Sequence, residues 1–395
     1  MDPLPEGGSF CYNAHGKERK KGEKSVARRI LAYFKKDVVF TVSLILAAGS
    51  CVLVPPGPVY ASYLDWHTLI MLFCLMVIVE GIRQTGAFLT LGQGLLHRVK
   101  SPRGVAAVLV FLCFFASMLV TNDVSLLTFV PFGMGILEMT GLRRQLPLTV
   151  VLMTIAANLG SMFTPIGNPQ NIYLFSLSGM SVGSFFILML PYTLLAAVLL
   201  AASLWLGVPK GMLPVASQGK ALLSARELLP YGVLFACAIA TVSGALPDGV
   251  LLGIVVVVLL WKKKELLLQA DFGLLLTFVF FFIFTGNLNA LPQLRAMMEQ
   301  ALAGRETLVS ILLSQVISNV PAAMLLSNYT NQISALIVGT NLGGLGTLIA
   351  SMASLISYKQ VAVQYPKEKK KYFCLFTTYN IGFLLLLYGL YILLS

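Results

Sequence analysis

The chain has 395 residues, of which 57% are hydrophobic and only 11% are charged, and this balance excludes a soluble domain of ordinary composition. Apolar runs long enough to cross about 30 Å of hydrocarbon as helices recur along it, without the two-residue alternation of a membrane barrel. The net charge of +12 lies mostly beside these runs, where basic residues set membrane orientation, so it does not indicate a nucleic-acid partner. We predict an all-α polytopic membrane protein.

The apolar runs predict about nine transmembrane helices. In chain order they cover residues 38–54, 66–82, 148–174, 185–207, 230–246, 250–261, 272–288, 333–356 and 373–394. Two further apolar stretches, 105–137 and 308–326, carry polar residues at their centres, and we interpret each as a re-entrant hairpin that returns to the side from which it entered. Residues 1–37 are rich in Lys, Arg and Gly, and we expect them to form a basic cytosolic tail.

The positions of Lys and Arg give the orientation. With the N-terminus in the cytosol, 26 of the 28 basic residues fall on the cytosolic side, and only Arg295 and Arg305 lie outside. A hairpin that crossed the membrane would invert every later loop, so the bias supports the hairpins and the orientation together. We therefore expect a C-terminus on the outer side of the cell (inner or plasma) membrane.

The order of elements occurs twice along the chain. Residues 38–207 and 250–395 each give two spans, a short amphipathic segment, a hairpin, a broken span and a final span. A linker and an unpaired helix, 208–249, separate these halves, and this extra crossing places the second half upside down in the membrane. Two inverted repeats with a polar site between them are typical of secondary transporters.

Matching polar residues mark the two hairpins and the two broken spans. Asn158-Leu159-Gly160 is followed by a Thr four residues after the Gly, and Asn341-Leu342-Gly343 repeats this spacing. Polar groups at bilayer depth persist only where they line a cavity or are buried in protein. We therefore predict one solute- or ion-binding site formed by Thr121, Asn122, Asp123, Asn158, Thr164, Gly167, Asn168, Asn171, Ser318, Asn319, Asn341, Thr347 and Ser351.

Asp123 is an acid at the centre of the first hairpin. A carboxylate at the bilayer centre costs about 2.5–3.5 kcal/mol on insertion scales, so we expect Asp123 to couple transport to an ion. Its structural alternative is a helix cap that accepts backbone N–H groups. Glu80 lies late in a span close to Arg83, and we expect these two side chains to pair at the membrane interface.

The first broken span contains two prolines and a glycine between Thr164 and Asn171. These residues end the helix and free carbonyl groups. Free carbonyls and nearby amides suit a cation, and the N-terminus of the resumed helix suits an anion; an ordinary kink filled by neighbouring helices is the alternative. The corresponding stretch of the second half uses glycines instead, and it serves either a site or close helix packing.

The Thr-Asn-Asp hairpin motif, the run Asn158-Leu159-Gly160 and the run Pro-Ile-Gly-Asn-Pro-Gln-Asn at 165–171 resemble the citrate-transporter-like domain of the ion transporter superfamily. That group includes arsenite permeases, divalent anion/sodium symporters and sodium/proton antiporters, and the similarity covers residues 38–394. The hairpin tips of the dicarboxylate symporters have Ser-Asn-Thr, whereas Ser318-Asn319 here precedes Val-Pro, which is closer to the arsenite permeases. The resemblance implies a homodimer with an elevator-like movement of the hairpin-bearing domain.

We expect a secondary active transporter of a small anion, an inorganic oxyanion or a carboxylate, driven by a proton or sodium gradient and needing no cofactor. A coupling Na⁺ would lie at Asn122, Asp123 and Gly167. The alternative is a sodium/proton-type cation antiporter in which Asp123 exchanges the ion for a proton. The sequence shows no Walker A loop and no nucleophile and base arrangement, so we expect no enzyme, and the His and Cys spacings do not predict a metal centre.

Overall fold

The computed structural model describes residues 38–211 and 225–395. The predicted cytosolic tail and residues 212–224 of the predicted linker lie outside the described residues. Within the described ranges the chain folds into helices joined by turns and short loops, without a strand. This confirms the predicted all-helical class.

In chain order, helices occur along both of the halves that the sequence predicts. The first half and the unpaired helix give α2 (Val38–Ser50), α3 (Tyr60–Tyr63), α4 (Trp66–Gln84), α5 (Ala87–Leu96), α6 (Pro102–Ser117), α7 (Asn122–Met139), η1 (Arg143–Gln145), α8 (Leu146–Ser161), α9 (Pro169–Ser178), α10 (Val182–Gly207) and α11 (Ala225–Val242). The second half gives α12 (Asp248–Lys262), α13 (Glu265–Leu268), α14 (Phe272–Asn289), α15 (Pro292–Leu302), α16 (Glu306–Ile317), α17 (Asn319–Leu326), α18 (Ile333–Leu342), α19 (Met352–Gln364), η2 (Pro366–Glu368) and α20 (Lys369–Leu394).

Each predicted hairpin and each predicted broken span consists of two helices. The pairs are α6 with α7 and α16 with α17 at the hairpins, and α8 with α9 and α18 with α19 at the broken spans. The re-entrant path of the hairpins stays a prediction. The break after α8 has a local cause. Pro169 starts α9, where its missing N–H costs nothing, and the Asn168 side chain caps that helix by accepting from Asn171 N at 3.0 Å.

Several predicted boundaries are wrong. α10 begins at Val182 and not at residue 185, α20 begins at Lys369 and not at residue 373, and α11 ends at Val242 and not at residue 246. The helix α2 ends at Ser50 and not at residue 54, because a series of turns follows it. The helix α11 begins before Pro230, at Ala225. The apolar run marks only the part of that helix that contacts apolar surroundings, whereas the charged residues Arg226 and Glu227 continue the helix beyond the run.

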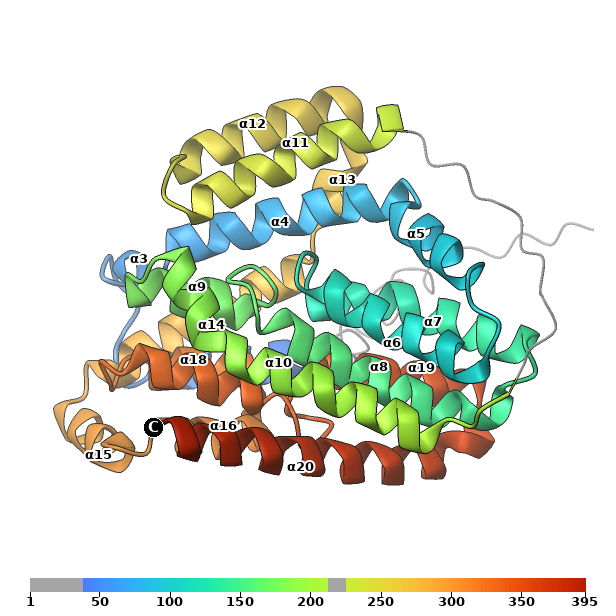
Figure 1. The fold of residues 1–395 in the computed structure, drawn as a ribbon. Coiled ribbons are helices and arrows are strands. Elements are labelled where there is room, and N and C mark those ends of the chain that lie inside the picture. The colour runs from blue at the N-terminus through green and yellow to red at the C-terminus, as the bar shows by residue number, and fades with distance from the viewer. Residues whose placement is uncertain (1–37, 212–224) are drawn as a thin grey trace, which may run out of the picture.

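The helices pack as two groups (Figure 1). We call α6–α10 together with α16–α20 the hairpin bundle, and α2, α4, α11, α12 and α14 the peripheral helices. Among the peripheral helices, α4 packs against α11 and α12, and α14 packs against α2. Contacts of α4 with α9 and of α14 with α17 join the two groups. In Figure 1, α6 and α7 lie toward the right of the molecule, and α16 and α18 lie toward the left.

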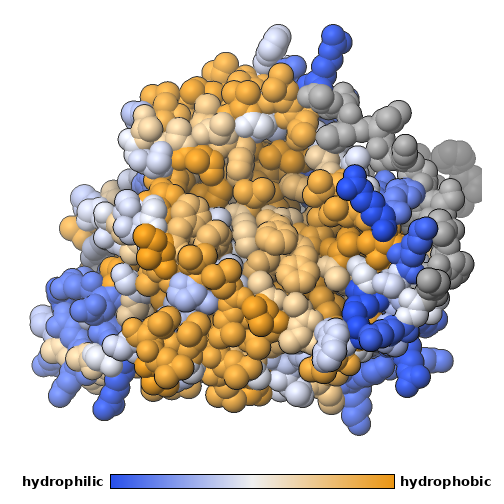
Figure 2. Space-filling view, viewed as in Figure 1, coloured by the Kyte–Doolittle hydropathy of each residue, from blue (hydrophilic) through white to orange (hydrophobic). Residues whose placement is uncertain are grey.

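The described helices have the composition of a polytopic membrane protein. Four of them, α4, α10, α14 and α20 with η2, are long and apolar enough to cross a membrane, and shorter apolar helices accompany them. Figure 2 shows apolar side chains over the middle of the molecule and hydrophilic ones gathered toward its left and right edges. The count of nine spans and the inverted arrangement of the halves stay predictions.

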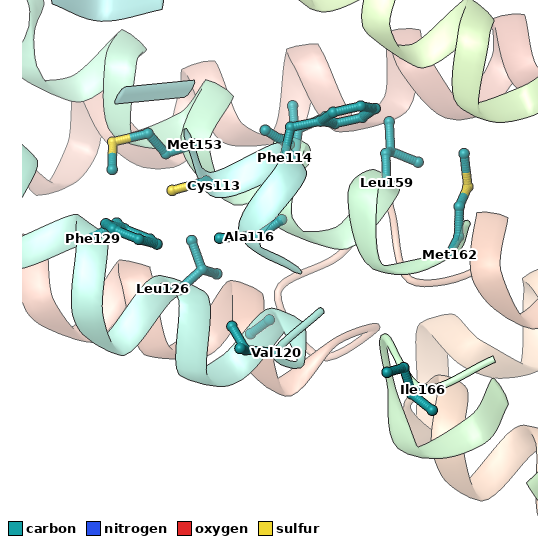
Figure 3. Close-up of a cluster of buried hydrophobic side chains, with 14 of the residues drawn as sticks. Cys113, Phe114, Ala116, Val120, Leu126, Phe129, Met153, Leu159, Met162 and Ile166 are labelled. Atoms are coloured by element: carbon teal, nitrogen blue, oxygen red, sulfur yellow. The ribbon is translucent and has the colours of Figure 1, made fainter. Parts of the chain in front are cut away.

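Apolar packing holds the first hairpin in place (Figure 3). Side chains of α6, α7, α8 and the loop after α8 meet in one buried cluster that includes Phe114, Leu126, Phe129, Met153, Leu159 and Ile166. In a bilayer such burial stabilises the packing through close van der Waals contacts rather than through removal of apolar surface from water. The turn between α6 and α7 is therefore fixed against α8, and the polar residues at that turn have defined positions.

Candidate functional site

The first hairpin turns between α6 and α7 and presents Asn122 as the first residue of α7. Asn122 is buried, and its Nδ2 donates to Asn158 Oδ1 of α8 at 3.0 Å. Its own Oδ1 accepts from the backbone N–H of Asp123 at 3.0 Å. Thr121 occupies the N-cap position without a side-chain capping bond. The hairpin tip is thus tied to the first broken helix pair by one amide group.

Asp123 lies in the first turn of α7 and is partly buried. Its Oδ1 is buried and has no hydrogen-bond partner among the described residues. The interpretation of Asp123 as the helix cap is wrong, because Thr121 stands at the N-cap and Asp123 lies inside the helix. A buried carboxylate oxygen without a partner is costly, and such a group is a candidate ion site. Glu80, by contrast, pairs with Arg83 at 2.7 Å as predicted.

The second hairpin turns at Ser318 between α16 and α17. Ser318 has a φ of 75°, and it is the single non-glycine residue with positive φ in the described ranges. Such a conformation costs on the order of 1–3 kcal/mol and often marks functional turns. Next to it, Asn319 N donates to Ala350 O at 3.0 Å, immediately before Ser351 at the N-cap of α19. This tip is therefore tied to the second broken helix pair.

Asn158, near the end of α8, joins the first hairpin tip to α19. Its Oδ1 accepts from Asn122 Nδ2 and from Ser351 Oγ, each at 3.0 Å. Its Nδ2 donates to Ser354 Oγ at 3.2 Å. Ser351 is the N-cap of α19 and Ser354 is the third residue of that helix. One buried amide thus links residues that lie almost 200 positions apart.

Asn341, near the end of α18, makes the equivalent connection to α9. Its Oδ1 accepts from Asn168 Nδ2 at 3.0 Å, and its Nδ2 donates to Asn171 Oδ1 at 2.6 Å. Asn168 is the N-cap of α9 and Asn171 is its third residue. We call these buried residues the polar cluster: Asn122, Asn158, Asn168, Asn171, Asn341, Ser351 and Ser354.

The repeated threonines also occupy equivalent places. Thr164 Oγ1 donates to Met118 O at 2.6 Å, and Thr347 Oγ1 donates to Gln315 O at 3.2 Å. Met118 and Gln315 each lie four residues before the Asn of their hairpin tip, Asn122 or Asn319. In both pairs the loop after the break is therefore fastened to the incoming arm of the neighbouring hairpin.

The repeated glycines allow close approach at equivalent positions. A Cβ on Gly160 would meet Phe114 O and Ser117 Oγ, and a Cβ on Gly343 would meet the side chain of Ser314. Ser117 and Ser314 each lie five residues before the Asn of the hairpin tip. The Asn-Leu-Gly motif thus serves one purpose in both places, since the Asn bonds across to the other half and the Gly packs on its own hairpin.

Gln315 is a site residue that the sequence analysis missed. Its Nε2 donates to the carbonyl oxygens of Gly343 at 3.0 Å and Leu345 at 2.9 Å, and its Oε1 accepts from Thr347 N at 2.8 Å. It therefore supports the backbone of the break after α18. The sequence does contain a signal for this residue, since Gln315 is a polar side chain in an apolar hairpin arm, one helical turn before the tip.

A second missed group lies one helical turn from Asn158. Thr154 Oγ1 donates to Ser357 Oγ at 2.8 Å, and the Tyr372 hydroxyl lies 3.3 Å from both. All three side chains are buried. They extend the polar surface along α8 and α19 away from the hairpin tips.

The structure brings most of the predicted site residues together. Six of them belong to the polar cluster, and Thr121, Asp123, Ser318 and Asn319 lie at the two tips that contact it. Thr164 and Gly167 lie in the first break, where a Cβ on Gly167 would meet Ser161 O. Thr347 is exposed and contacts Gln315 rather than the cluster.

Four helices begin at this place. α7 starts at Asn122, α17 starts at Asn319, and α9 and α19 start directly after Asn168 and Ser351. Each helix N-terminus carries about half a positive charge and unpaired N–H groups. The site is therefore electropositive at its backbone, while its side chains are amides, hydroxyls and one carboxylate.

An all-helical apolar fold that gathers polar groups around two broken helix pairs defines the class of a membrane transporter. The citrate transporter family model matches residues 30–333, and the chain belongs to this family. Two relatives are similar over most of their length. An uncharacterized transporter of Methanocaldococcus jannaschii is 31% identical over 75% of this chain and 81% of the relative, and the inner membrane protein YbiR of Escherichia coli is 30% identical over 82% of this chain and 87% of the relative.

A shorter similarity concerns a plant protein. The silicon efflux transporter LSI3 of Oryza sativa is 36% identical over 33% of this chain and 27% of the relative. The family and these relatives support a secondary transporter.

Proposed function

We propose that the protein carries a small anion, an inorganic oxyanion or a carboxylate, in exchange or symport with H⁺ or Na⁺, and that the polar cluster with the two hairpin tips is its binding site. The observation that carries this proposal is the meeting of four helix N-termini around buried amides and hydroxyls. Backbone N–H groups at helix N-termini bind anions without any basic side chain.

The charge of the bundle favours a substrate of low charge. Residues 104–142, 145–209 and 306–358, which form most of the hairpin bundle, contain no Lys, Arg or His. A divalent carboxylate would therefore have only helix ends, amides and bound cations to balance it. A monovalent or weakly ionised oxyacid needs less compensation. The name of the rice relative, a silicon efflux transporter, supports this preference.

Asp123 is the proposed coupling group. Its buried Oδ1 has no hydrogen-bond partner among the described residues, and it lies beside Asn122 at the tip of the first hairpin. A carboxylate in such a position binds a cation or a proton to reduce the cost of burial. For Na⁺, Asn122 and the carbonyls exposed at the break around Gly167 are the further oxygen ligands that we propose.

The equivalent contacts of the two broken pairs support an inverted repeat of residues 38–207 and 250–395. Asn158 and Asn341 each bond to the N-cap and third residue of the helix after the other break. One site between two such halves, open alternately to either side, is the expected mechanism. We further propose that the protein lies in the inner or plasma membrane with its N-terminus in the cytosol. The homodimer that the family resemblance implies stays a prediction.

One observation favours a second function. The unpaired oxygen of Asp123 would suit a cation/proton antiporter that carries no anion, since ion and proton would compete for one carboxylate. The two functions differ in what an added anion does. In the antiporter, transport of the cation does not depend on the anion present.

A transport assay separates these proposals. Full-length protein in liposomes is tested for uptake of silicate, arsenite, phosphate and citrate under an imposed proton or sodium gradient. We expect one oxyanion to be carried faster than citrate, and Asn158→Leu to abolish its uptake, while the control Asn380→Leu in α20 retains it. Gradient-driven cation flux that none of the four solutes changes would contradict the anion proposal and support the antiporter.

A further inference from the structure

A basic cavity lies among the peripheral helices, away from the polar cluster. It has a volume of about 440 Å³ and lies where α4 ends, α11 begins and α12 ends. Its lining carries three basic side chains, Arg226, Lys262 and Lys263, and one acidic side chain, Glu227. The volume lies within the range of small-molecule sites, and the excess of positive charge selects an anion.

The positive charges of this cavity are not neutralised by ion pairs within the described residues. Lys263 Nζ donates to Gln84 Oε1, a neutral partner, at 2.6 Å, and Lys262 Nζ lies over the Trp261 ring at 5.4 Å. The acid nearest on α4, Glu80, already pairs with Arg83. Glu80 also attracts Lys263 electrostatically, but no carboxylate of the described residues forms an ion pair with Arg226, Lys262 or Lys263, so the lining keeps an excess of positive charge.

The base of the cavity is built by a close approach of two helices. Tyr231 of α11 lies directly against Gly81 of α4, so that any Cβ at position 81 would meet the tyrosine ring. Both residues line the cavity. This contact packs α11 against α4, and both helices supply polar side chains to the lining, Arg226 from α11 and Gln84 from α4.

The surroundings of the cavity are those of a membrane surface. α11 and α12 lie at the outer edge of the molecule (Figure 1), and apolar side chains cover them in Figure 2. The exposed apolar residues of α11 and α12 include Leu229, Val233, Val257 and Leu260, and Trp261, which precedes Lys262 of the lining, is 83% exposed. A Trp and Lys pair at the end of an apolar helix is typical of the level of the lipid headgroups.

We propose that this cavity binds the phosphate-bearing headgroup of an acidic phospholipid, whose acyl chains lie along the exposed apolar faces of α11 and α12. The ligand chemistry is a phosphate ester held by Arg226, Lys262 and Lys263. Basic pockets between membrane helices favour such headgroups. The lipid is favoured over a soluble phosphate because the cavity opens beside exposed apolar side chains, which acyl chains cover.

The test measures binding of phosphatidylglycerol and phosphatidylcholine to the purified full-length protein by native mass spectrometry and by lipid-induced thermal stabilisation. We expect preferential binding of phosphatidylglycerol, which Arg226→Gln with Lys262→Gln reduces by about tenfold or more. Glu227→Gln is expected to strengthen binding, because it removes the one acid of the lining. The control Lys367→Gln with Lys370→Gln changes two exposed lysines near η2 and should leave binding unchanged.

Three outcomes would overturn the proposal. The first is equal binding of both lipids, or equal binding of phosphatidylglycerol to wild type and the double variant. The second is comparable binding of glycerophosphate or inorganic phosphate alone, which would assign the cavity to a soluble anion. The third is a changed oligomeric state in the double variant with unchanged lipid binding, which would assign this face to a second copy of the chain.

Discussion

Asn158 of α8 and Asn341 of α18 make the same two contacts in opposite directions. Asn158 reaches Ser351 and Ser354 at the start of α19, and Asn341 reaches Asn168 and Asn171 at the start of α9. Each broken helix pair thus supplies both an amide at the end of its first helix and a cap at the start of its second. This reciprocity makes the two breaks one polar structure.

Loss of either amide should therefore weaken both breaks. Asn158→Leu and Asn341→Leu are each expected to lower the free energy of unfolding by about 1–3 kcal/mol, because they leave buried partners unpaired. Denaturant unfolding in detergent measures the change. The matched control is Asn380→Leu: Asn380 is also buried, but among the described residues its side chain donates only to Phe376 O and its Oδ1 has no partner. Equal losses in Asn341→Leu and Asn380→Leu would contradict the structural role of the cluster.

Asp123→Asn should separate binding from coupling. The amide keeps the size of the side chain but cannot carry the charge that balances a cation, so solute exchange should continue while dependence on the ion gradient is lost. Flux in liposomes with and without the gradient gives the answer. Glu138→Gln is the control, because Glu138 lies on the same helix but bonds to Tyr365 outside the cluster. Wild-type coupling in Asp123→Asn would leave this acid without a transport role.

Gly167 and Gly135 should respond oppositely to alanine. A Cβ at Gly167 would meet Ser161 O in the break, whereas Gly135 in α7 has open space around it. Gly167→Ala is expected to reduce stability and folded yield, because backbone must move, and Gly135→Ala to be neutral or stabilising by about 0.5–1 kcal/mol. Thermal unfolding compares them. A well-folded Gly167→Ala protein of wild-type stability would contradict the close approach at the break.

Cysteine labelling tests the orientation. Single cysteines at Lys262 and Lys369 should react with a membrane-impermeant reagent from the cytosolic face, and a cysteine at Arg295 from the outer face, as the basic residues predict. Intact cells and inverted vesicles supply the two faces. Labelling of positions 262 and 369 from opposite faces would show that one predicted hairpin crosses the membrane.

Local sequence patterns predicted where this chain breaks its helices. Pro169 and Asn168 form a helix start that can be recognised in any sequence, and the repeated Asn-Leu-Gly motif predicts Asn158 and Asn341 as equivalent site residues. The helix start and the repeated motif each depend only on residues that are close together in the sequence. Both can therefore be predicted without knowledge of the fold.

The partners of these residues could not be predicted in the same way. The contact between Asn158 and Ser354 joins residues 196 positions apart, and no local pattern encodes such a pairing. Gln315 donates to the backbone carbonyl oxygens of Gly343 and Leu345. Every residue has a backbone carbonyl, so the sequence does not show which residues accept these bonds. The alternative interpretation of Asp123 as a cap misplaces the start of α7 by two residues, because Thr121 is the N-cap, and helix starts are the least certain part of a sequence-based boundary.

The central claim is that both broken helix pairs contribute to one solute site. Counterflow in liposomes, with the solute that the wild type carries fastest, tests it most directly for wild type, Asn158→Leu, Asn341→Leu and Asn380→Leu. We predict that both cluster variants lose counterflow, although they lie on different breaks, and that Asn380→Leu retains it. Wild-type counterflow in either Asn158→Leu or Asn341→Leu, with the variant correctly folded, would contradict a site shared by the two halves.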